Sequence, residues 1–212
     1  MAERSIWNIP ELWPGSTIYI LGGGPGLQPN DLPKLKGKRV IAVNQAFREY
    51  PQADLLYFGD GQFYRDNYKA IRGFGGIIVT SYTTAPPDGK GWPNVRRVGR
   101  SKRMGIELTK KGFISWNNNS GASAINLAYW LGAKRVVLLG FDMKAVAGKH
   151  NWHSHYRKRP TNWNPYPKHL ECWSSIMADA NRLGIEIVNA TPMSAIKEIP
   201  IVGFEEVLKN DS

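Results

Sequence analysis

The sequence contains little cysteine and no long apolar stretch. Its 212 residues include a single cysteine, Cys172, which excludes an internal disulfide and a cysteine-rich zinc site. No run of about 18 apolar residues occurs, so the sequence predicts no membrane span, and it has no charged-then-apolar leader. We therefore expect a soluble, cytoplasmic protein in which Cys172 is a buried structural thiol within a helix.

Acidic residues are also scarce. The chain has 17 of them against 28 lysines and arginines, a net charge of +11. This charge favours anionic partners, and nucleotides, phosphosugars and nucleic acid all qualify. Residues 84–111 are rich in Pro and Gly and are expected to form a basic, partly irregular insertion. They hold two acidic residues, Asp88 and Glu107, and eight basic ones: Lys90, Arg96, Arg97, Arg100, Lys102, Arg103, Lys110 and Lys111.

The length predicts one domain spanning residues 1–212. Short apolar runs alternate with segments long enough for a helix, which is typical of a mostly parallel α/β sheet with helices on both faces. The expected strands are Ser16–Leu21, Arg39–Val43, Leu55–Phe58, Gly76–Thr80, Arg135–Leu139 and Ile185–Val188. The clearest helices are Gly121–Leu131, with Ser120 as its cap, and His169–Arg182, which ends at Gly184.

Small or polar residues follow five of these strands. Ligands of parallel sheets bind beyond the carboxyl ends of the strands, so these residues would meet at one edge and form a binding site. The alternative is that turns simply favour Gly, Asn and Asp. The residues are Gly22, Gly23, Gly24, Pro25 and Gly26, then Asn44 and Gln45, then Gly59 and Asp60, then Gly140–Asp142, and finally Asn189.

The glycine turn, residues 22–26, matches no standard phosphate-binding fingerprint. A dinucleotide motif would need glycine where Leu27 stands, and no Gly-Lys-Ser/Thr follows to make a P-loop. Consecutive glycines still let backbone N–H groups approach phosphate oxygens. A nucleotide-contacting turn and a merely tight turn therefore both stay open.

A second anion site is predicted at the start of the first helix. There Asn119, Ser120 and Gly121 offer an amide, a hydroxyl and free helix N–H groups to a phosphate. Ordinary helix capping would also explain Ser120.

Residues 143–168 form a long connection rich in histidine, tryptophan and arginine, and we expect a lid-like loop that is functional. The spacing His-x-x-His-x-His of His150, His153 and His155 suits a general base, a metal ligand or solvated side chains. Asp60 or Asp142 would have to complete a metal site. Arg157 belongs to a basic run that forms a solvated face or clamps a leaving phosphate.

Four motifs occur together along the chain: Leu21-Gly-Gly-Gly-Pro-Gly-Leu27, Val43-Asn-Gln45, Asn119-Ser-Gly121 and Leu139-Gly-Phe-Asp142. Their order and spacing resemble the bacterial family 42 sialyltransferases, whose pattern is Gly-Asn-Gly-Pro-Ser-Leu, Cys-Asn-Gln, Thr-Ser-Gly and Ser-Gly-Ile-Asp-Phe. The chain is also similar to a broader set of bacterial and phage proteins related to archaeal 6-hydroxymethylpterin pyrophosphokinases. In that set a His-Trp-His-like loop follows the Gly-Phe-Asp strand, as residues 148–155 do here.

The resemblance implies a Rossmann-like variant of the nucleotide-sugar transferase fold. The glycine turn, Asn44 and Ser120-Gly121 would hold a CMP- or UDP-type donor, and magnesium would not be required. A histidine after the Asp142 strand, His155 or His153, would take the proton of the acceptor hydroxyl. The tyrosines that the family uses to hold the leaving phosphate have no counterpart soon after Phe141, and Tyr156 or Arg157 would replace them. Related transferases often form homo-oligomers.

Two other functions stay open. A magnesium-dependent diphosphokinase or nucleotidyltransferase of the pterin type would depend on Asp60 and Asp142 as metal-carrying carboxylates. A nucleic-acid-binding or DNA-modifying protein would use the basic insertion to hold phosphates.

Overall fold

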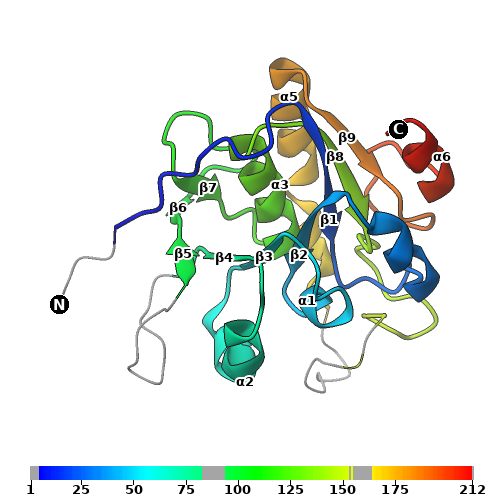
Figure 1. The fold of residues 1–212 in the computed structure, drawn as a ribbon. Helices are drawn as coiled ribbons and strands as arrows, with labels where there is room; N and C mark the ends of the chain where they lie inside the picture. Colours follow the sequence, from blue (N-terminus) through cyan, green and yellow to red (C-terminus); the bar gives the residue numbers. More distant parts are fainter. Residues whose placement is uncertain (1–4, 83–93, 153, 155–163, 212) are drawn as a thin grey trace.

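The computed structural model describes residues 5–82, 94–152, 154 and 164–211. Its main sheet has seven strands, all parallel, in the order β5-β4-β3-β2-β1-β8-β9 (Figure 1). A second parallel sheet pairs β6 (Gly99–Ser101) with β7 (Phe113–Ser115). The strands of the main sheet are β1 (Ser16–Leu21), β2 (Arg39–Val43), β3 (Leu55–Phe58), β4 (Ile77–Thr80), β5 (Val95–Arg97), β8 (Ala133–Leu139) and β9 (Glu186–Asn189).

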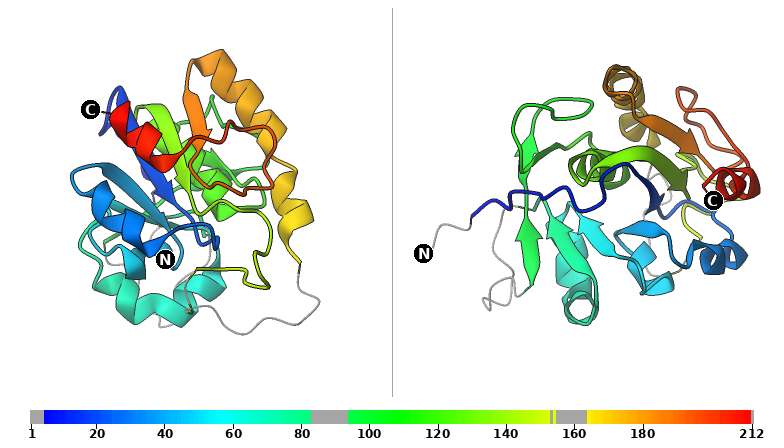
Figure 2. Two further views of the ribbon diagram at one scale, coloured as in Figure 1. Left: turned by 90° about the vertical axis from the view of Figure 1, so that its right-hand side faces the viewer. Right: turned by 45° about the horizontal axis from the view of Figure 1, so that its top comes forward.

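Helices cover both faces of the main sheet (Figure 2). Successive side chains of β1 alternate between two cores, with Ile18 and Ile20 in one and Tyr19 and Leu21 in the other. The first core is closed by α3 (Ser120–Trp130) and α5 (Trp173–Leu183). The second is closed by the 3-10 helix η1 (Pro29–Leu35) and by α1 (Ala46–Glu49), α2 (Gly61–Arg72) and α6 (Phe204–Lys209).

This two-sided burial explains the sequence pattern. A strand that is covered on both faces reads as a continuous apolar run and not as an alternating one, and the central strands do so. The prediction of a mostly parallel α/β sheet with helices on both faces is confirmed, and the fold is Rossmann-like. Within the described part of the chain, no helix has the length and apolar character that crossing a membrane requires.

Two helix predictions need correction. The first helix begins one residue earlier than expected, and its cap is Asn119 instead of Ser120, because Asn119 Oδ1 accepts hydrogen bonds from the Gly121 and Ala122 N–H groups of the first turn. The second helix is two helices, α4 (Tyr166–Leu170) and α5, with the fully buried Cys172 between them. Burial raises the pKa of the Cys172 thiol to about 12, as expected of a structural thiol.

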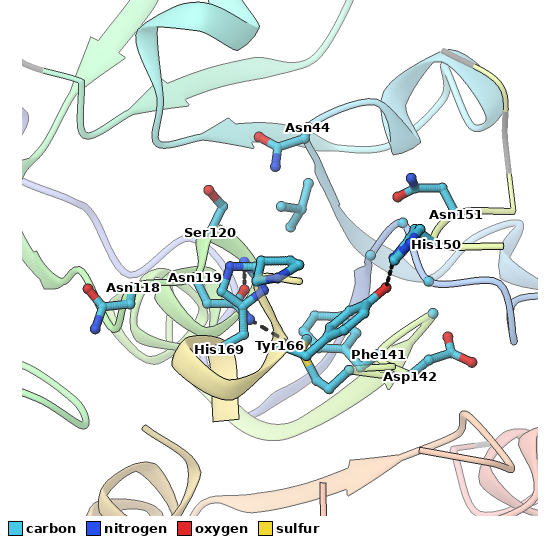
Figure 3. A pocket seen from close by; sticks show the side chains of 18 of the residues that line it. Asn44, Asn118, Asn119, Ser120, Phe141, Asp142, His150, Asn151, Tyr166 and His169 are labelled. Carbon is cyan, nitrogen blue, oxygen red and sulfur yellow. Dashed lines mark hydrogen bonds between the residues drawn. The ribbon is translucent and has the colours of Figure 1, made fainter. Parts of the chain in front are cut away.

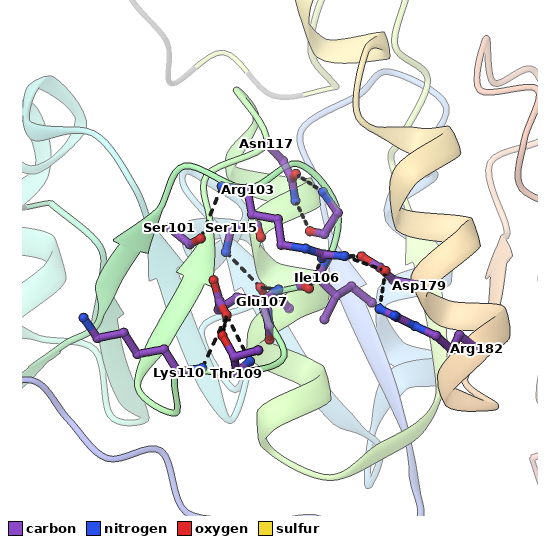
Figure 4. Close-up of polar contacts among 12 residues, drawn as sticks. Ser101, Arg103, Ile106, Glu107, Thr109, Lys110, Ser115, Asn117, Asp179 and Arg182 are labelled. Atoms are coloured by element: carbon purple, nitrogen blue, oxygen red, sulfur yellow. Dashed lines mark hydrogen bonds and ion pairs between the residues drawn. The ribbon is translucent and has the colours of Figure 1, made fainter.

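Strands β5, β6 and β7 were not predicted. Each spans three residues, too few for a periodic pattern to register. The described part of the insertion, residues 94–111, is therefore more regular than expected. Asp179 of α5 fixes it to the rest of the molecule by accepting hydrogen bonds from the Arg103 guanidinium (2.8 Å) and the Ile106 backbone N–H (2.8 Å) (Figure 4).

Glu107 is a second buried anchor of the same segment. The Thr109 backbone N–H (3.0 Å) and hydroxyl (2.7 Å) both donate to Glu107 Oε1, and so does the Lys110 backbone N–H (3.3 Å). Burial raises the pKa of this carboxyl, but the hydrogen bonds from Ser101, Thr109 and Lys110 outweigh burial and lower the pKa to about 2.

Stability should therefore depend on Glu107 in a defined pH range. A carboxyl whose pKa is lowered in the folded state stabilises the fold above its unfolded pKa, and this contribution is lost as pH falls through the folded pKa. The window here runs from about pH 4.5 down to about 2. Urea unfolding at pH 6 should give Glu107→Gln a lower free energy of unfolding than the wild type. This difference in free energy should be smaller at pH 2.5. Glu206→Gln, on the exposed side of α6, is the matched control. A Glu107→Gln gap that stays constant over this range would contradict the assignment.

Candidate functional site

A pocket of about 410 Å³ lies at the carboxyl edge of the main sheet, where the strand order reverses. From β1 the chain winds outward through β2 to β5 on one side, and β8 and β9 lie on the other. The loops after β1 and β8 therefore diverge, which leaves the crevice in which open α/β sheets bind ligands. The lining consists of Gly22–Gly24, Val43, Asn44, Asp60, Trp116, residues 118–121, residues 140–144, His150, Asn151, Pro165, Tyr166 and His169.

Asp142 packs beneath the glycine turn. Its Oδ2 accepts a hydrogen bond from the Gly26 backbone N–H at 3.0 Å, and the residue is 1% exposed. A Cβ added to Gly24 would lie 2.2 Å from Asp142 Oδ2, and one added to Gly26 would lie 2.6 Å from Oδ1. Both positions need glycine because the carboxylate occupies the space of a side chain. The turn is thus tight for a structural reason, in addition to any contact it makes with a ligand.

The carboxylate of Asp142 is placed to hold this turn. Burial raises the pKa of Asp142, and the hydrogen bond from Gly26 opposes that shift. Its Oδ1 has no hydrogen-bond partner among the described residues. In Figure 3 the carboxylate lies at the margin of the pocket and is directed away from His169 and Tyr166. Asp142 is one of the carboxylates expected to carry a metal at this edge, and its contacts in the structure are with the loop after β1, which it holds in position.

The start of α3 forms a second wall of the pocket. Asn119 Oδ1 accepts hydrogen bonds from the N–H groups of Gly121 (2.8 Å) and Ala122 (3.2 Å), so two donors that were expected to face an anion are already used. The Ser120 hydroxyl bonds to no other described residue and lies inside the pocket. Ser120 and the positive end of the α3 dipole are what this wall offers to an anionic ligand.

Of the polar residues that follow β2 and β3, Asn44 and Asp60 line the pocket and Gln45 does not. Asn44 lines the pocket in a left-handed conformation, with φ 52°, and its buried Oδ1 has no partner among the described residues. Asp60 lines it at the β3 end, where its Oδ1 caps α2 by accepting from the Phe63 N–H at 2.6 Å. Gln45 does not line the pocket: it is buried, and its amide donates to Asn67 Oδ1 at 3.0 Å. Pro25 and Gly26 also lie outside the lining.

Two residues of the long connection, His150 and Tyr166, line the pocket as a pair. His150 Nδ1 and the Tyr166 hydroxyl lie 2.8 Å apart, and the two rings stack with their centroids 5.6 Å apart (Figure 3). Burial and the nearby charge of Asp142 raise the pKa of Tyr166, so its hydroxyl keeps its proton. Tyr166 was not predicted as a site residue.

His169, also missed, is the other titratable group in the pocket. It follows Tyr166 by three residues in α4, which places both on one side of that helix. Burial, followed by the charge of Lys168, lowers the pKa of His169, so the imidazole is neutral near pH 7. Its ring nitrogens bond to no other described residue. The spacing Tyr-x-x-His at the start of a helix could have indicated that the two side chains share one face. The prediction instead rested on the upstream histidines His150, His153 and His155.

Three predicted site residues, His153, His155 and Arg157, lie outside the described residues. The residue before them, Trp152, is attached to the glycine turn: its Nε1 donates to the Gly22 carbonyl (3.1 Å) and its backbone N–H to the Gly23 carbonyl (3.2 Å). The first two carbonyls of the turn are thus bonded to the long connection. Within the described ranges no group of three or more His, Cys, Asp or Glu side chains is arranged to hold a metal ion.

Comparison with solved structures defines the class of fold. The chain is similar to the sialyltransferase CstII from Campylobacter jejuni in complex with the substrate analogue CMP-3FNeuAc, with a TM-score of 0.50 and 13% identity over 88% of this chain and 86% of that one. A second structure of CstII, in complex with cytidine-5'-monophosphate, has a TM-score of 0.48 and 11% identity over 87% and 84% of the two chains. No family model and no curated protein matches the sequence. The fold is therefore sialyltransferase-like.

The contact between Asp142 and the glycine turn can be tested by a substitution that adds one methyl group to the turn. Gly24→Ala places a Cβ against Asp142 Oδ2 and the Gly140 carbonyl, so we expect the free energy of unfolding to fall by about 1–3 kcal/mol. The control is Gly75→Ala, where nothing lies within 4 Å of the added Cβ and the expected change is within about 0.5 kcal/mol. Urea denaturation measures both. Equal effects of the two variants would contradict the packing described here.

Proposed function

We propose that the protein is a glycosyltransferase that binds a nucleotide-sugar donor of the CMP type in the pocket between β1 and β8. The observation that carries the proposal is the meeting, in one pocket at the strand-order reversal, of a helix N-terminus and a neutral histidine and tyrosine. A transferase of this kind needs both an anion-binding wall and a base beside it. The CMP type is proposed because the structural neighbour is a sialyltransferase in complex with a CMP-containing analogue.

Donor binding uses groups that have no partner within the described chain. The Asn44 side chain lines the pocket, and its amide N–H donates a hydrogen bond to an acceptor of the nucleoside. The Ser120 hydroxyl and the positive end of α3 bind the phosphate. The glycine turn brings its backbone close to the ligand because no side chain stands between them.

The reaction is a direct displacement at the anomeric carbon of the donor sugar. The oxygen of an acceptor hydroxyl forms a bond to that carbon while the bond from the carbon to the phosphate oxygen breaks. The proton of the hydroxyl passes to a ring nitrogen of His169, and the phosphate oxygen leaves with the electron pair of the broken bond. The Tyr166 hydroxyl donates a hydrogen bond to the departing phosphate, in the role that Tyr156 or Arg157 was expected to fill.

His169 takes the place of His155 and His153 in this proposal because it lines the pocket beside Tyr166. Burial also lowers its pKa, which keeps the base unprotonated at neutral pH. His150 supports the reaction indirectly by holding the Tyr166 hydroxyl at 2.8 Å.

The class of donor can be identified by measuring the melting temperature of the protein with CMP, CDP, UDP, GDP, ADP and ATP, each with magnesium and with a chelator. A ligand at about 100 times its dissociation constant adds about 2.7 kcal/mol, or roughly 5–10 °C for a chain of this size. We expect CMP to give this shift with the chelator present. A shift only with ATP and magnesium would contradict the proposal and favour a diphosphokinase.

The base can be identified by hydrolysis of a CMP-sugar, in which water takes the place of the acceptor. His169→Asn should lower the rate by about 10²–10⁴-fold with CMP affinity nearly unchanged, because the imidazole acts on the acceptor and not on the nucleotide. In the wild type the rate should rise with pH to a plateau, with a midpoint below 6.5. His153→Asn and His155→Asn are the matched controls. If either of these abolishes hydrolysis and His169→Asn does not, the base lies in the long connection and the assignment to His169 is wrong.

A further inference from the structure

Almost all of the net charge lies in about one third of the chain. Residues 67–141 contain twelve lysines and arginines and two acidic residues, a net charge of +10, whereas the whole chain carries +11. Of the two acidic residues, Asp88 lies outside the described residues, and Glu107 is buried with its carboxylate engaged by Thr109 and Lys110. The exposed positive charge of this third is therefore not balanced by an exposed carboxylate among its described residues.

The exposed cations gather at one end of the molecule. Strands β5, β6 and β7 lie together there, at the left of Figure 1. Four exposed basic residues, here called the basic surface, lie on these strands or in the loop that joins β6 to β7: Arg96, Lys102, Lys110 and Lys111. None of the four forms an ion pair with a carboxylate of the described chain. Arg103, the neighbour of Lys102, differs in being paired with Asp179. The fold thus pairs Arg103 with a carboxylate and leaves the four residues of the basic surface without one. Of these four, Lys110 also lies with its Nζ 3.7 Å from the centroid of the Phe113 ring.

The basic surface adjoins the pocket through Trp116. The Trp116 backbone N–H donates to the Ser101 carbonyl at the end of β6 (3.3 Å), and its ring lines the pocket. The Arg100 guanidinium stacks on that ring at 3.9 Å from the centroid, while its Nε donates to Ser81 Oγ at 3.2 Å. Arg100 forms no ion pair with a carboxylate of the described chain, and its guanidinium also donates to the Gly59 carbonyl, so this half-buried cation extends the surface to the pocket wall.

We propose that the basic surface binds the phosphodiester backbone of nucleic acid. A backbone of closely spaced phosphates matches a set of exposed cations on short strands, and each contact releases condensed counterions. Such contacts fix position without reading base sequence. A bound nucleic acid would lie beside the mouth of the pocket at Trp116. The inference rests on charge and exposure alone, so it stands or fails separately from the proposed transfer reaction.

The test is fluorescence anisotropy of the full-length protein with a labelled 24-base-pair DNA duplex at several salt concentrations. The variant Lys102→Gln, Lys110→Gln, Lys111→Gln should bind at least about tenfold more weakly near 50 mM salt, and the slope of log affinity against log salt should fall by about 3. The matched control Lys36→Gln, Lys197→Gln, Lys209→Gln removes the same charge from three exposed lysines elsewhere and should bind like the wild type. Thermal melting of both variants reports whether they are folded.

Three outcomes would overturn the proposal. Equal weakening by the control variant would mean that net charge acts without a defined surface. Wild-type affinity in the test variant would mean that these lysines make no contact. Binding of heparin together with no binding of the duplex would mean that the partner is an acidic polysaccharide and not nucleic acid.

Discussion

The position of the candidate site depends on the contact between the ends of β1 and β8. These two strands are neighbours in the sheet, yet the chain departs from them in opposite directions, and a crevice forms only if both loops keep their shape. Asp142 holds the loop after β1 through the Gly26 N–H, and the Gly24 N–H donates to the Gly140 carbonyl at 2.8 Å. Without glycine at position 24 or 26, the carboxylate and the turn would compete for the same space. The glycine-rich sequence and the aspartate 116 residues later are therefore parts of one structural unit.

The pocket is lined by two sets of segments of the chain, which are held in place in different ways. The turn after β1 and the start of α3 are held by the sheet and by the Asn119 cap, so they present a preformed wall. The opposite side comes from residues of the long connection and from His169 just after it. It is attached to the first side through Trp152, which bonds to the Gly22 and Gly23 carbonyls. A rigid wall for an anion, with a histidine and a tyrosine brought to it by a second segment, is an arrangement that suits group transfer.

Much of the fold could be predicted from the sequence because the central strands are buried on both faces and read as apolar runs. The strands Arg39–Val43 and Leu55–Phe58 match the prediction at both ends, and the edge at which Gly22, Asn44 and Asp60 would meet is where the pocket lies. The strands β5 to β7 could not be predicted, since each spans only three residues and is fixed by pairing with a strand distant in the sequence, β5 with β4 and β6 with β7. In the same way, Gln45 and Asn44 are adjacent polar residues after one strand, and only the fold decides that one turns inward to Asn67 and the other lines the pocket. His169 was not predicted because its place in the pocket depends on where α4 lies in the fold, which short-range spacing does not reveal.

A crystal structure of the protein with CMP would test the account most directly. We expect the phosphate within hydrogen-bond distance of the Ser120 hydroxyl, the nucleoside at the Asn44 side chain, and the His169 ring facing the site where the anomeric carbon of a donor would lie. CMP bound away from the crevice between β1 and β8, or in it with its phosphate remote from the start of α3, would contradict the account.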